Sequence, residues 1–239
     1  NNPIARLKKG NNYLNPSIDI IADDSLHEDS KLKLSIFLNK WLVKRINEEL
    51  GDLIKLTKHQ IQNQHLRGLL FQLYENNGVI KRNEIDKIVN AIPKEERKKL
   101  WGMGIKIGRY HVYLPKMLKP KAVEFRIKLW EIFHNVSDKN KIPKSGLNFL
   151  TESNLDRNFL LLCGFEKFRE FFVRIDILEK LFLKIMEKTK GKKFQINSQM
   201  MNLLGCSKEN FYKLMTYMNY KKDKTADTYI FKGEKKKKE

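Results

Sequence analysis

The stretch "LLGCSKENFYKLM", residues 203–215, predicts a sharp corner between two helices. Gly205 can adopt the positive φ that ends a helix, because glycine has no Cβ to oppose that conformation. Ser207 can cap the helix that follows, since its hydroxyl can accept a hydrogen bond from a backbone N–H of the first turn. Such a corner is typical of a helix-turn-helix.

The segments on either side of this corner extend the pattern. A strong helix ending at Gly191 is predicted before it, followed by a short strand at 194–196. Asn197 or Ser198 can cap the helix that enters the corner. Beyond the corner, two strand candidates flank a polar tip at 223–227. The order is therefore helix, strand, helix, turn, helix and hairpin.

The same order of elements occurs earlier in the chain. A helix is predicted to end at Asn77 and Gly78, and a short strand follows. Asn83 can cap the next helix, and Pro93 suits the first turn of a third. Two β-type runs then form a hairpin that turns at Gly108.

This order is that of a winged helix, a helix-turn-helix variant whose hairpin forms a wing beside the third helix. We therefore predict a mainly α fold with short β-hairpins, in which two winged-helix-like units, at about 60–118 and 174–233, are joined by helices. The two segments agree in element order and not in residue identity. An ordinary helical domain with two short hairpins is therefore the alternative.

The rest of the chain is predicted from periodicity and composition. One apolar stripe at spacings of three and four predicts a long helix over 29–56, which Asp29 or Ser30 can cap. A further amphipathic helix is predicted over 119–134, followed by a polar linker. The predicted organisation is an extended N-terminal linker at 1–28, the long helix with the first winged-helix-like unit at 29–145, the second unit at 146–233 and a disordered basic tail at 234–239.

The charge of the chain favours a polyanionic partner. Its 48 Lys and Arg against 28 Asp and Glu give a formal net charge of +20, and such an excess attracts nucleic acid or an anionic membrane. Most of the basic residues are lysines, so a general enrichment of lysine on solvated surfaces is the alternative. The charge is concentrated in segment 81–128, which holds fourteen basic and five acidic residues.

In a winged helix the third helix and the wing face the ligand, so basic residues there can neutralise phosphates. Tyr110, His111 and Tyr113 add rings on which unpaired bases can stack. Because side chains alternate along a strand, one of the two tyrosines is expected in the core. The predicted nucleic-acid-binding residues are Lys94, Arg97, Lys98, Lys106, Arg109 at the wing tip, His111, Lys116, Lys119 and Lys121 in the first unit, and Lys208, Lys213, Lys221 and Lys222 in the second.

Motifs for catalysis or metal binding are missing from the sequence. It contains no GxxxxGK[ST] phosphate loop and no DExD or DExH motif, and its five histidines form no HExxH pattern. Asp176 and Glu179 share a helix face with an apolar stripe, and we interpret them as a cap or an ion pair. We therefore predict no catalytic residue, no metal site and no cofactor for this chain.

The cysteine content and hydropathy indicate the compartment. Cys163 and Cys206 form no CxxC pair, which favours a reduced, intracellular protein. No apolar run approaches the roughly 20 residues of a transmembrane helix. The expectation is a cytoplasmic protein with no membrane partner.

Four segments together resemble the C-terminal region of an alphaproteobacterial family of superfamily-two helicases, related to the RNA helicase of the mitochondrial degradosome. They are "PIARLKKG" at 3–10, "IADDSL" at 21–26, "GRYHVYLPKMLKPKA" at 108–122 and "LLGCSKENFYKLMTYMNYK" at 203–221.

The resemblance implies a longer native protein with an ATP-driven motor N-terminal to residue 1, and ATP and Mg would serve that motor alone. This chain would be the accessory region that helps to hold the strand leaving the motor. It departs from the family where Lys, Asn or Ile often stand at positions that the family fills with Arg or Ala.

The sequence is compatible with three classes of function. The first is a nucleic-acid-binding accessory region of a helicase, with RNA favoured over DNA. The second is a protein-interaction scaffold that docks on the helicase motor or on a nuclease partner, through the long helix or the winged-helix-like units. The third is a free-standing enzyme, which would need a cluster of titratable groups that the sequence does not show.

Overall fold

The structure is a computed structural model that describes residues 3–21, 27–136, 142–151, 156–189, 193–223 and 228–231. It divides into two units, the first made of Asn1–Lys106 and Val112–Ile142 and the second of Ile107–His111 and Pro143–Glu239. Helices dominate both units, and the sheets are small and antiparallel where their register is defined. The prediction of a mainly α fold with short hairpins is confirmed.

Helix α1 (Glu28–Lys55) is the long helix predicted from the apolar stripe. The inner face of its C-terminal half is buried through Leu42, Ile46 and Leu50, as expected for residues spaced by four. The predicted cap is wrong, because His27 precedes the helix and makes no side-chain cap bond. Asp29 lies in the first turn, where its charge complements the helix dipole.

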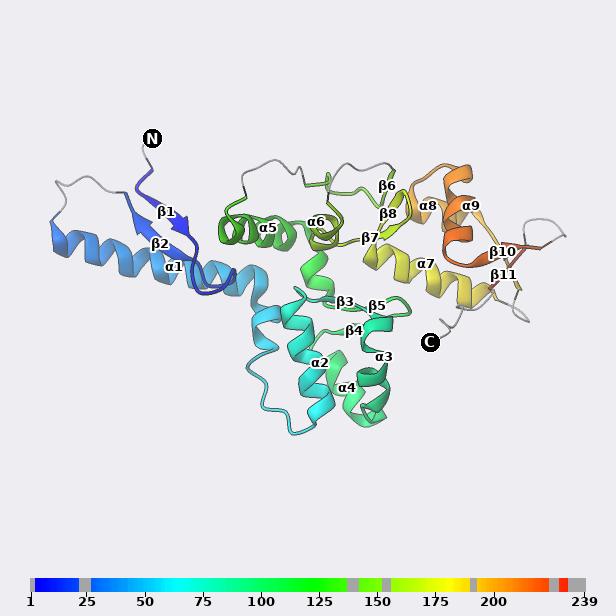
Figure 1. Cartoon of the computed structure of the whole chain (residues 1–239), viewed down its shortest axis with the longest axis horizontal. Coiled ribbons are helices and arrows are strands. Elements are labelled where there is room, and N and C mark those ends of the chain that lie inside the picture. The colour runs from blue at the N-terminus through cyan, green and yellow to red at the C-terminus, as the bar shows by residue number, and fades with distance from the viewer. Residues whose placement is uncertain are drawn as a thin grey trace. The chain divides into compact units, whose positions relative to one another are not determined.

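Strands β1 (Ala5–Lys8) and β2 (Ser17–Ile20) form an antiparallel hairpin in the N-terminal segment, which was predicted only to be extended. Figure 1 shows this hairpin lying along α1. Asp19 is opposite Arg6 in the register, and its carboxylate oxygen lies 2.8 Å from both the Arg6 Nε and the Lys8 Nζ. A side chain at Gly10 would meet the Asn15 carbonyl oxygen, so the loop between the strands requires glycine.

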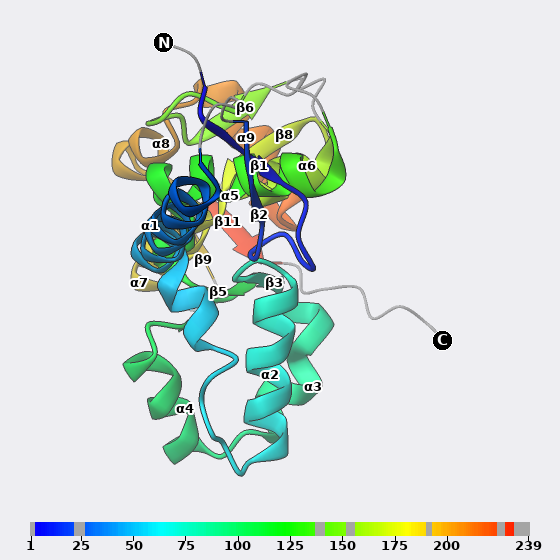
Figure 2. The ribbon, with the colours of Figure 1, turned by 90° about the vertical axis from the view of Figure 1, so that its left-hand side faces the viewer.

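The first helix–strand–helix–helix–hairpin pattern is present in the predicted order. Its three helices stand together below the strands in Figure 2, and the strand order is β3-β5-β4. The elements are α2 (Gln64–Glu75), β3 (Val79–Lys81), α3 (Arg82–Ala91), α4 (Lys94–Gly102), β4 (Lys106–Ile107) and β5 (His111–Tyr113).

Most predictions from local sequence signals in this segment are confirmed. Asn77 and Gly78 have φ of 58° and 80° and end α2, as the Asn-Gly pair predicts. Pro93 lies one residue before α4. The predicted cap of α3 is wrong, because the helix begins at Arg82 and Asn83 lies inside its first turn.

The first unit ends with a 3-10 turn, η1 (Pro115–Leu118), and helix α5 (Pro120–His134), which the sequence predicted over 119–134. Pro120 suits the first helical position, since its missing N–H is not needed there. Helix α5 contacts α1 and β1 and ends at Asn135, whose φ is 53°.

The second unit opens with a sheet that the sequence analysis largely missed. Strands β6 (Phe149–Thr151), β7 (Phe165–Phe168) and β8 (Phe171–Arg174) pair in the order β6-β8-β7, with helix α6 (Arg157–Leu162) between the first two. The run "RNFLLLCGF", residues 157–165, contains both α6 and the first residue of β7. In the structure the helix ends before Gly164, whose φ is 89°, and β7 follows.

The second helix–strand–helix–helix–hairpin pattern is also present, around a core that includes Leu178, Leu181, Phe211 and Leu214. Its elements are α7 (Ile175–Lys188), β9 (Lys193–Gln195), α8 (Ser198–Leu204), α9 (Lys208–Tyr217), β10 (Tyr220–Lys222) and β11 (Thr228–Phe231). The predicted Gly191, the polar tip beyond 223 and the basic tail lie outside the described residues.

The corner between α8 and α9 has the predicted geometry. Gly205 has a φ of 68° and ends α8, while the Ser207 Oγ accepts a hydrogen bond from the Asn210 N–H at 3.2 Å. At the start of α8, the Asn197 Oδ1 accepts from the Met200 N–H at 3.0 Å, so Asn197 is the cap. Gly205 supplies the positive φ, and Ser207 supplies the hydroxyl acceptor, which an apolar side chain lacks.

The two patterns share one connectivity. In each, the third strand lies in the middle of the sheet, between the first strand and the second: the orders are β3-β5-β4 and β9-β11-β10. Each hairpin therefore follows two helices and pairs with a strand that precedes them.

Candidate nucleic-acid interface

The hairpin turn at residues 108–111, part of the second unit, is held by a buried carboxylate of α7. The Glu179 Oε2 accepts a hydrogen bond from the Arg109 N–H at 2.7 Å. Its Oε1 accepts from the N–H groups of Tyr110 and His111 at 2.9 and 2.8 Å. A side chain at Gly108 would lie 2.3 Å from the Glu179 Cδ, so only glycine leaves room for this carboxylate. The turn thus binds an anion from its own chain.

His111 lies between two carboxylates and is only 1% exposed. Its Nε2 is 2.9 Å from the Glu166 Oε2, and its Nδ1 is 3.4 Å from the Glu179 Oε1. Burial lowers the pKa of His111, but the hydrogen bond to Glu166 and the adjacent Glu179 carboxylate outweigh burial and leave the pKa raised. The predicted role of His111 as a stacking surface is therefore wrong, because its ring is enclosed.

The His111 site predicts that stability depends on pH. A folded-state pKa above the unfolded value of about 6.5 means that its stabilisation is complete below that value and is lost as pH rises through the folded pKa. We expect the urea midpoint of the wild-type chain to fall as pH rises through the folded-state pKa of His111. In the His111→Gln variant this pH-dependent fall should be absent. Urea titrations followed by circular dichroism between acidic and alkaline pH would measure it. An identical pH dependence in both proteins would contradict it.

The two tyrosines beside His111 are also packed. Tyr110 makes edge-to-face contacts with Phe168 and Phe182, at centroid distances of 6.4 and 5.9 Å. Burial raises the pKa of the Tyr110 phenol. Tyr113 is 5% exposed. The sequence placed one tyrosine in the core, whereas the structure packs Tyr113 fully and Tyr110 in large part.

Arg109 keeps an exposed side chain, and its guanidinium carbon lies 5.7 Å from the centre of the Phe231 ring. Its backbone N–H is one of the three that donate to the Glu179 carboxylate. Lys106, predicted to act with it, is exposed on β4. The turn therefore presents a basic side chain at its surface while its backbone is fixed.

The α4 residues are less available than predicted. The Arg97 guanidinium donates to the carbonyl oxygens of Ile92 and Asn90 at 3.0 and 3.2 Å, so it ties α4 to the end of α3. Lys98 pairs with Glu95 at 3.0 Å, one turn away on an exposed face. Lys94 is exposed at the start of the helix. Of these three residues, Arg97 stabilises the packing of α4 on α3, and Lys98 is paired within α4.

The basic residues that follow the first hairpin are exposed. The Lys116 Nζ lies 2.8 Å from the Asp52 Oδ2, which joins η1 to α1. Lys119 and Lys121 stand at the start of α5. Within the first unit, the predicted residues thus lie on several elements and share no common aromatic ring in the described residues.

In the second unit, two predicted lysines meet at one ring. The Lys208 Nζ, at the start of α9, and the Lys222 Nζ, at the end of β10, each lie 5.6 Å from the centre of the Tyr212 ring. On the sheet side, Tyr229 stacks on Tyr212 at 6.2 Å and an interplanar angle of 23°. We name Lys208, Tyr212 and Lys222 the Tyr212 cluster.

Two more predicted lysines lie on the same elements as this cluster. Lys213 pairs with Glu209 at 2.8 Å, and that hydrogen bond raises the pKa of Lys213. Lys221 is exposed on β10. Helix α9 and strand β10 contact each other. The second unit thus places these four lysines and the half-buried Tyr212 on two neighbouring elements.

Comparison with protein-family models, with curated proteins and with solved structures finds no match for this chain. The geometry and the sequence therefore carry the functional inference.

The described residues also bear on metal binding, thiol reactivity and membrane crossing. No group of three or more His, Cys, Asp and Glu side chains in that part could hold a metal ion. Burial raises the pKa of the Cys206 thiol to about 11, so the nucleophilic thiolate is scarce at neutral pH. None of the described helices combines the length and apolar character needed to cross a membrane.

Sequence reasoning did not assign Tyr212 or Glu166 to these sites, and it left the partner of Glu179 open. Tyr212 lies four residues after Lys208, a spacing that puts both on one helix face, and this signal was available. Glu179 was interpreted as a cap or an ion pair, and the structure shows that it caps a turn. Its neighbour Asp176 pairs with Arg174 at 2.8 Å. Nothing in the sequence pointed to Glu166, because its partner His111 is 55 residues away.

Proposed function

We propose that this chain binds single-stranded nucleic acid, RNA in preference to DNA, and that the Tyr212 cluster is the centre of its binding surface. The observation that carries the proposal is the position of Lys208 and Lys222, which come from different elements and approach the same ring. Lysines neutralise phosphates, and a tyrosine ring offers a sequence-tolerant stacking surface for an unpaired base.

Connectivity supports a winged-helix assignment for both helix–strand–helix–helix–hairpin patterns. The order of helices and strands and the central position of the third strand are those expected of that fold. In this assignment α9 is the third helix and β10 and β11 form the wing. These are the elements that commonly face nucleic acid, and they carry the cluster.

The resemblance to helicase C-terminal regions supports a more specific role. In this proposal the chain is the accessory region of a cytoplasmic, ATP-dependent helicase and holds the strand that leaves the motor. ATP and Mg belong to the motor, and this chain contributes no catalytic residue. Four sequence segments carry the resemblance, among them the α8–α9 corner on which the cluster is built.

A protein-interaction scaffold is the second candidate, favoured by the N-terminal half of α1. Leu32, Phe37 and Trp41 are 62%, 65% and 53% exposed there. Large apolar side chains gathered on an exposed helix are typical of docking surfaces. The scaffold hypothesis predicts that removing the lysines of the Tyr212 cluster leaves nucleic-acid binding unchanged.

A salt titration tests the proposed function. We expect single-stranded RNA to bind more tightly than single-stranded DNA or duplex RNA, with an affinity that falls steeply with salt. The double variant Lys208→Gln with Lys222→Gln should weaken binding and reduce the slope of log affinity against log salt by roughly one to two units. Fluorescence anisotropy at several salt concentrations would measure both.

A matched control is available on α7, where Lys180 and Lys188 are also exposed. Replacing both by Gln removes the same charge from the same unit and should leave most of the binding in place. Equal losses in the two double variants would mean that the lysines act through net charge alone, which would contradict the proposed site.

A further inference from the structure

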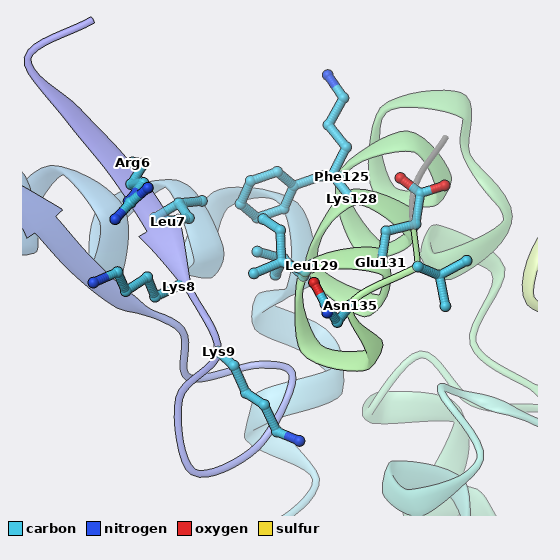
Figure 3. Close-up of a pocket in the computed structure, with 11 residues that line it drawn as sticks. Arg6, Leu7, Lys8, Lys9, Phe125, Lys128, Leu129, Glu131 and Asn135 are labelled. Carbon is cyan, nitrogen blue, oxygen red and sulfur yellow. The ribbon is translucent and has the colours of Figure 1, made fainter. Parts of the chain in front are cut away.

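The first unit contains a pocket of about 920 Å³ between β1 and α5, shown in Figure 3. Its volume is within the range of small-ligand sites, roughly 300–1,000 Å³. Four of its lining residues are basic and one is acidic. The lining consists of Arg6, Leu7, Lys8, Lys9, Phe125, Lys128, Leu129, Glu131, Ile132, Asn135 and Val136.

An apolar surface lies in the middle of this pocket. Figure 3 shows Leu7 of β1 and Phe125 of α5 pointing toward one another, with Leu129 beside them. Phe125 is half-buried, and the Arg45 guanidinium lies 5.9 Å from the centre of its ring. A flat, partly apolar group can stack on such a ring.

Two lysines extend from opposite ends of the pocket. In Figure 3 the Lys9 and Lys128 side chains reach away from each other, with Phe125 between them. The Lys9 Nζ lies 4.5 Å from the centre of the Phe133 ring. Within the described residues, neither lysine has a carboxylate at ion-pair distance. Arg6 and Lys8, in contrast, already share Asp19.

We propose that this pocket holds one unpaired nucleotide within a nucleic-acid strand, with the base on Phe125 and the flanking phosphates near Lys9 and Lys128. A nucleotide inside a strand has a phosphate on each side of its base, which matches cations at both ends of an apolar centre. A lipid has one headgroup and would need the cations at one end only. The Asn135 amide can meet the edge of a base.

This site lies in the first unit and does not depend on the Tyr212 cluster. The test therefore uses the full chain carrying Lys208→Gln and Lys222→Gln, which removes two cations of that cluster. The probe is the trinucleotide of uridine, titrated by calorimetry beside inorganic phosphate. The Tyr212 proposal can fail while this trinucleotide still binds the pocket. Equally, the pocket can fail to bind the trinucleotide while the Tyr212 cluster binds RNA.

Phe125 gives the decisive pair of variants. In the test background, Phe125→Leu keeps apolar bulk but removes the ring, and we expect trinucleotide affinity to fall about tenfold. Phe125→Trp keeps a stacking surface and should retain the affinity. Melting curves identify any loss due to misfolding. Equal affinity in the Leu variant, or competition by inorganic phosphate at the same concentration as the trinucleotide, would overturn the proposal.

Variants of Lys9 and Lys128 provide a second test of the pocket. Lys9→Gln with Lys128→Gln should weaken trinucleotide binding and flatten its salt dependence, whereas Lys87→Gln, on an exposed face of α3, should not. Vesicles of anionic phospholipid test the other source of phosphate. Binding of vesicles without binding of the trinucleotide would overturn the proposal in favour of a membrane surface.

Discussion

Glu179→Ala is expected to destabilise the second unit by at least about 3 kcal/mol, because it leaves three backbone donors without their acceptor at a cost of about 1–3 kcal/mol each. The donors are the N–H groups of Arg109, Tyr110 and His111, at 2.7–2.9 Å from the carboxylate. The change also removes a carboxylate from the side of the His111 ring. The loss should appear as a lower urea midpoint in circular dichroism.

Two further measurements connect this loss to the turn. Glu179→Gln keeps one acceptor oxygen, so we expect about half of the destabilisation. In Glu179→Ala, hydrogen exchange at the amides of Arg109, Tyr110 and His111 should accelerate. Glu187→Ala, on an exposed position of the same helix, is the control. Unchanged protection of the three amides in Glu179→Ala would show that the carboxylate does not hold the turn.

Arg126→Ala is expected to destabilise the first unit by about 3–5 kcal/mol, through loss of a buried charged hydrogen bond and the cavity left behind. Arg126 is 1% exposed, and its Nη1 donates to the Asn77 carbonyl oxygen at 2.5 Å. The Tyr13 hydroxyl donates to the Asn77 Oδ1. Arg126 and Tyr13 therefore fix the residue whose positive φ ends α2.

Tryptophan fluorescence can assign this loss to the first unit, because Trp41, Trp101 and Trp130 all lie there. The fluorescence midpoint in urea should fall strongly in Arg126→Ala. It should fall less in Arg126→Met, which retains apolar volume at the site. Lys121→Ala, exposed on the same helix, should be close to wild type. A fluorescence midpoint in Arg126→Ala equal to that of wild type would contradict the structural role of Arg126.

Local chemistry explains why much of the fold could be predicted. Gly205, Ser207 and Asn197 act within four residues of their own positions, and each behaves as the sequence predicts. The element order of both repeated patterns follows from such signals together with apolar periodicity. The β1–β2 hairpin and strands β6 and β7 were not recognised, because short strands in polar or continuously apolar runs lack a distinctive period.

The candidate site depended on contacts that sequence reasoning cannot see. His111 and Glu179 are separated by 68 residues and meet only after folding, so a ring that looked available for stacking is enclosed. Arg97 looked like a phosphate contact and instead binds carbonyl oxygens of the preceding turn. Lys208 and Lys222 were predicted individually, but their common ring required the packing of α9 on β10.

Photo-crosslinking tests the central claim most directly. Single-stranded RNA carrying 4-thiouridine would be irradiated with the full chain, and the crosslinked peptides identified by mass spectrometry. If the Tyr212 cluster is the centre of the binding surface, the crosslinks should include the peptide that contains Tyr212, and the Lys208→Gln with Lys222→Gln variant should lose them. Crosslinks confined to other peptides, such as those of α4, would contradict the account.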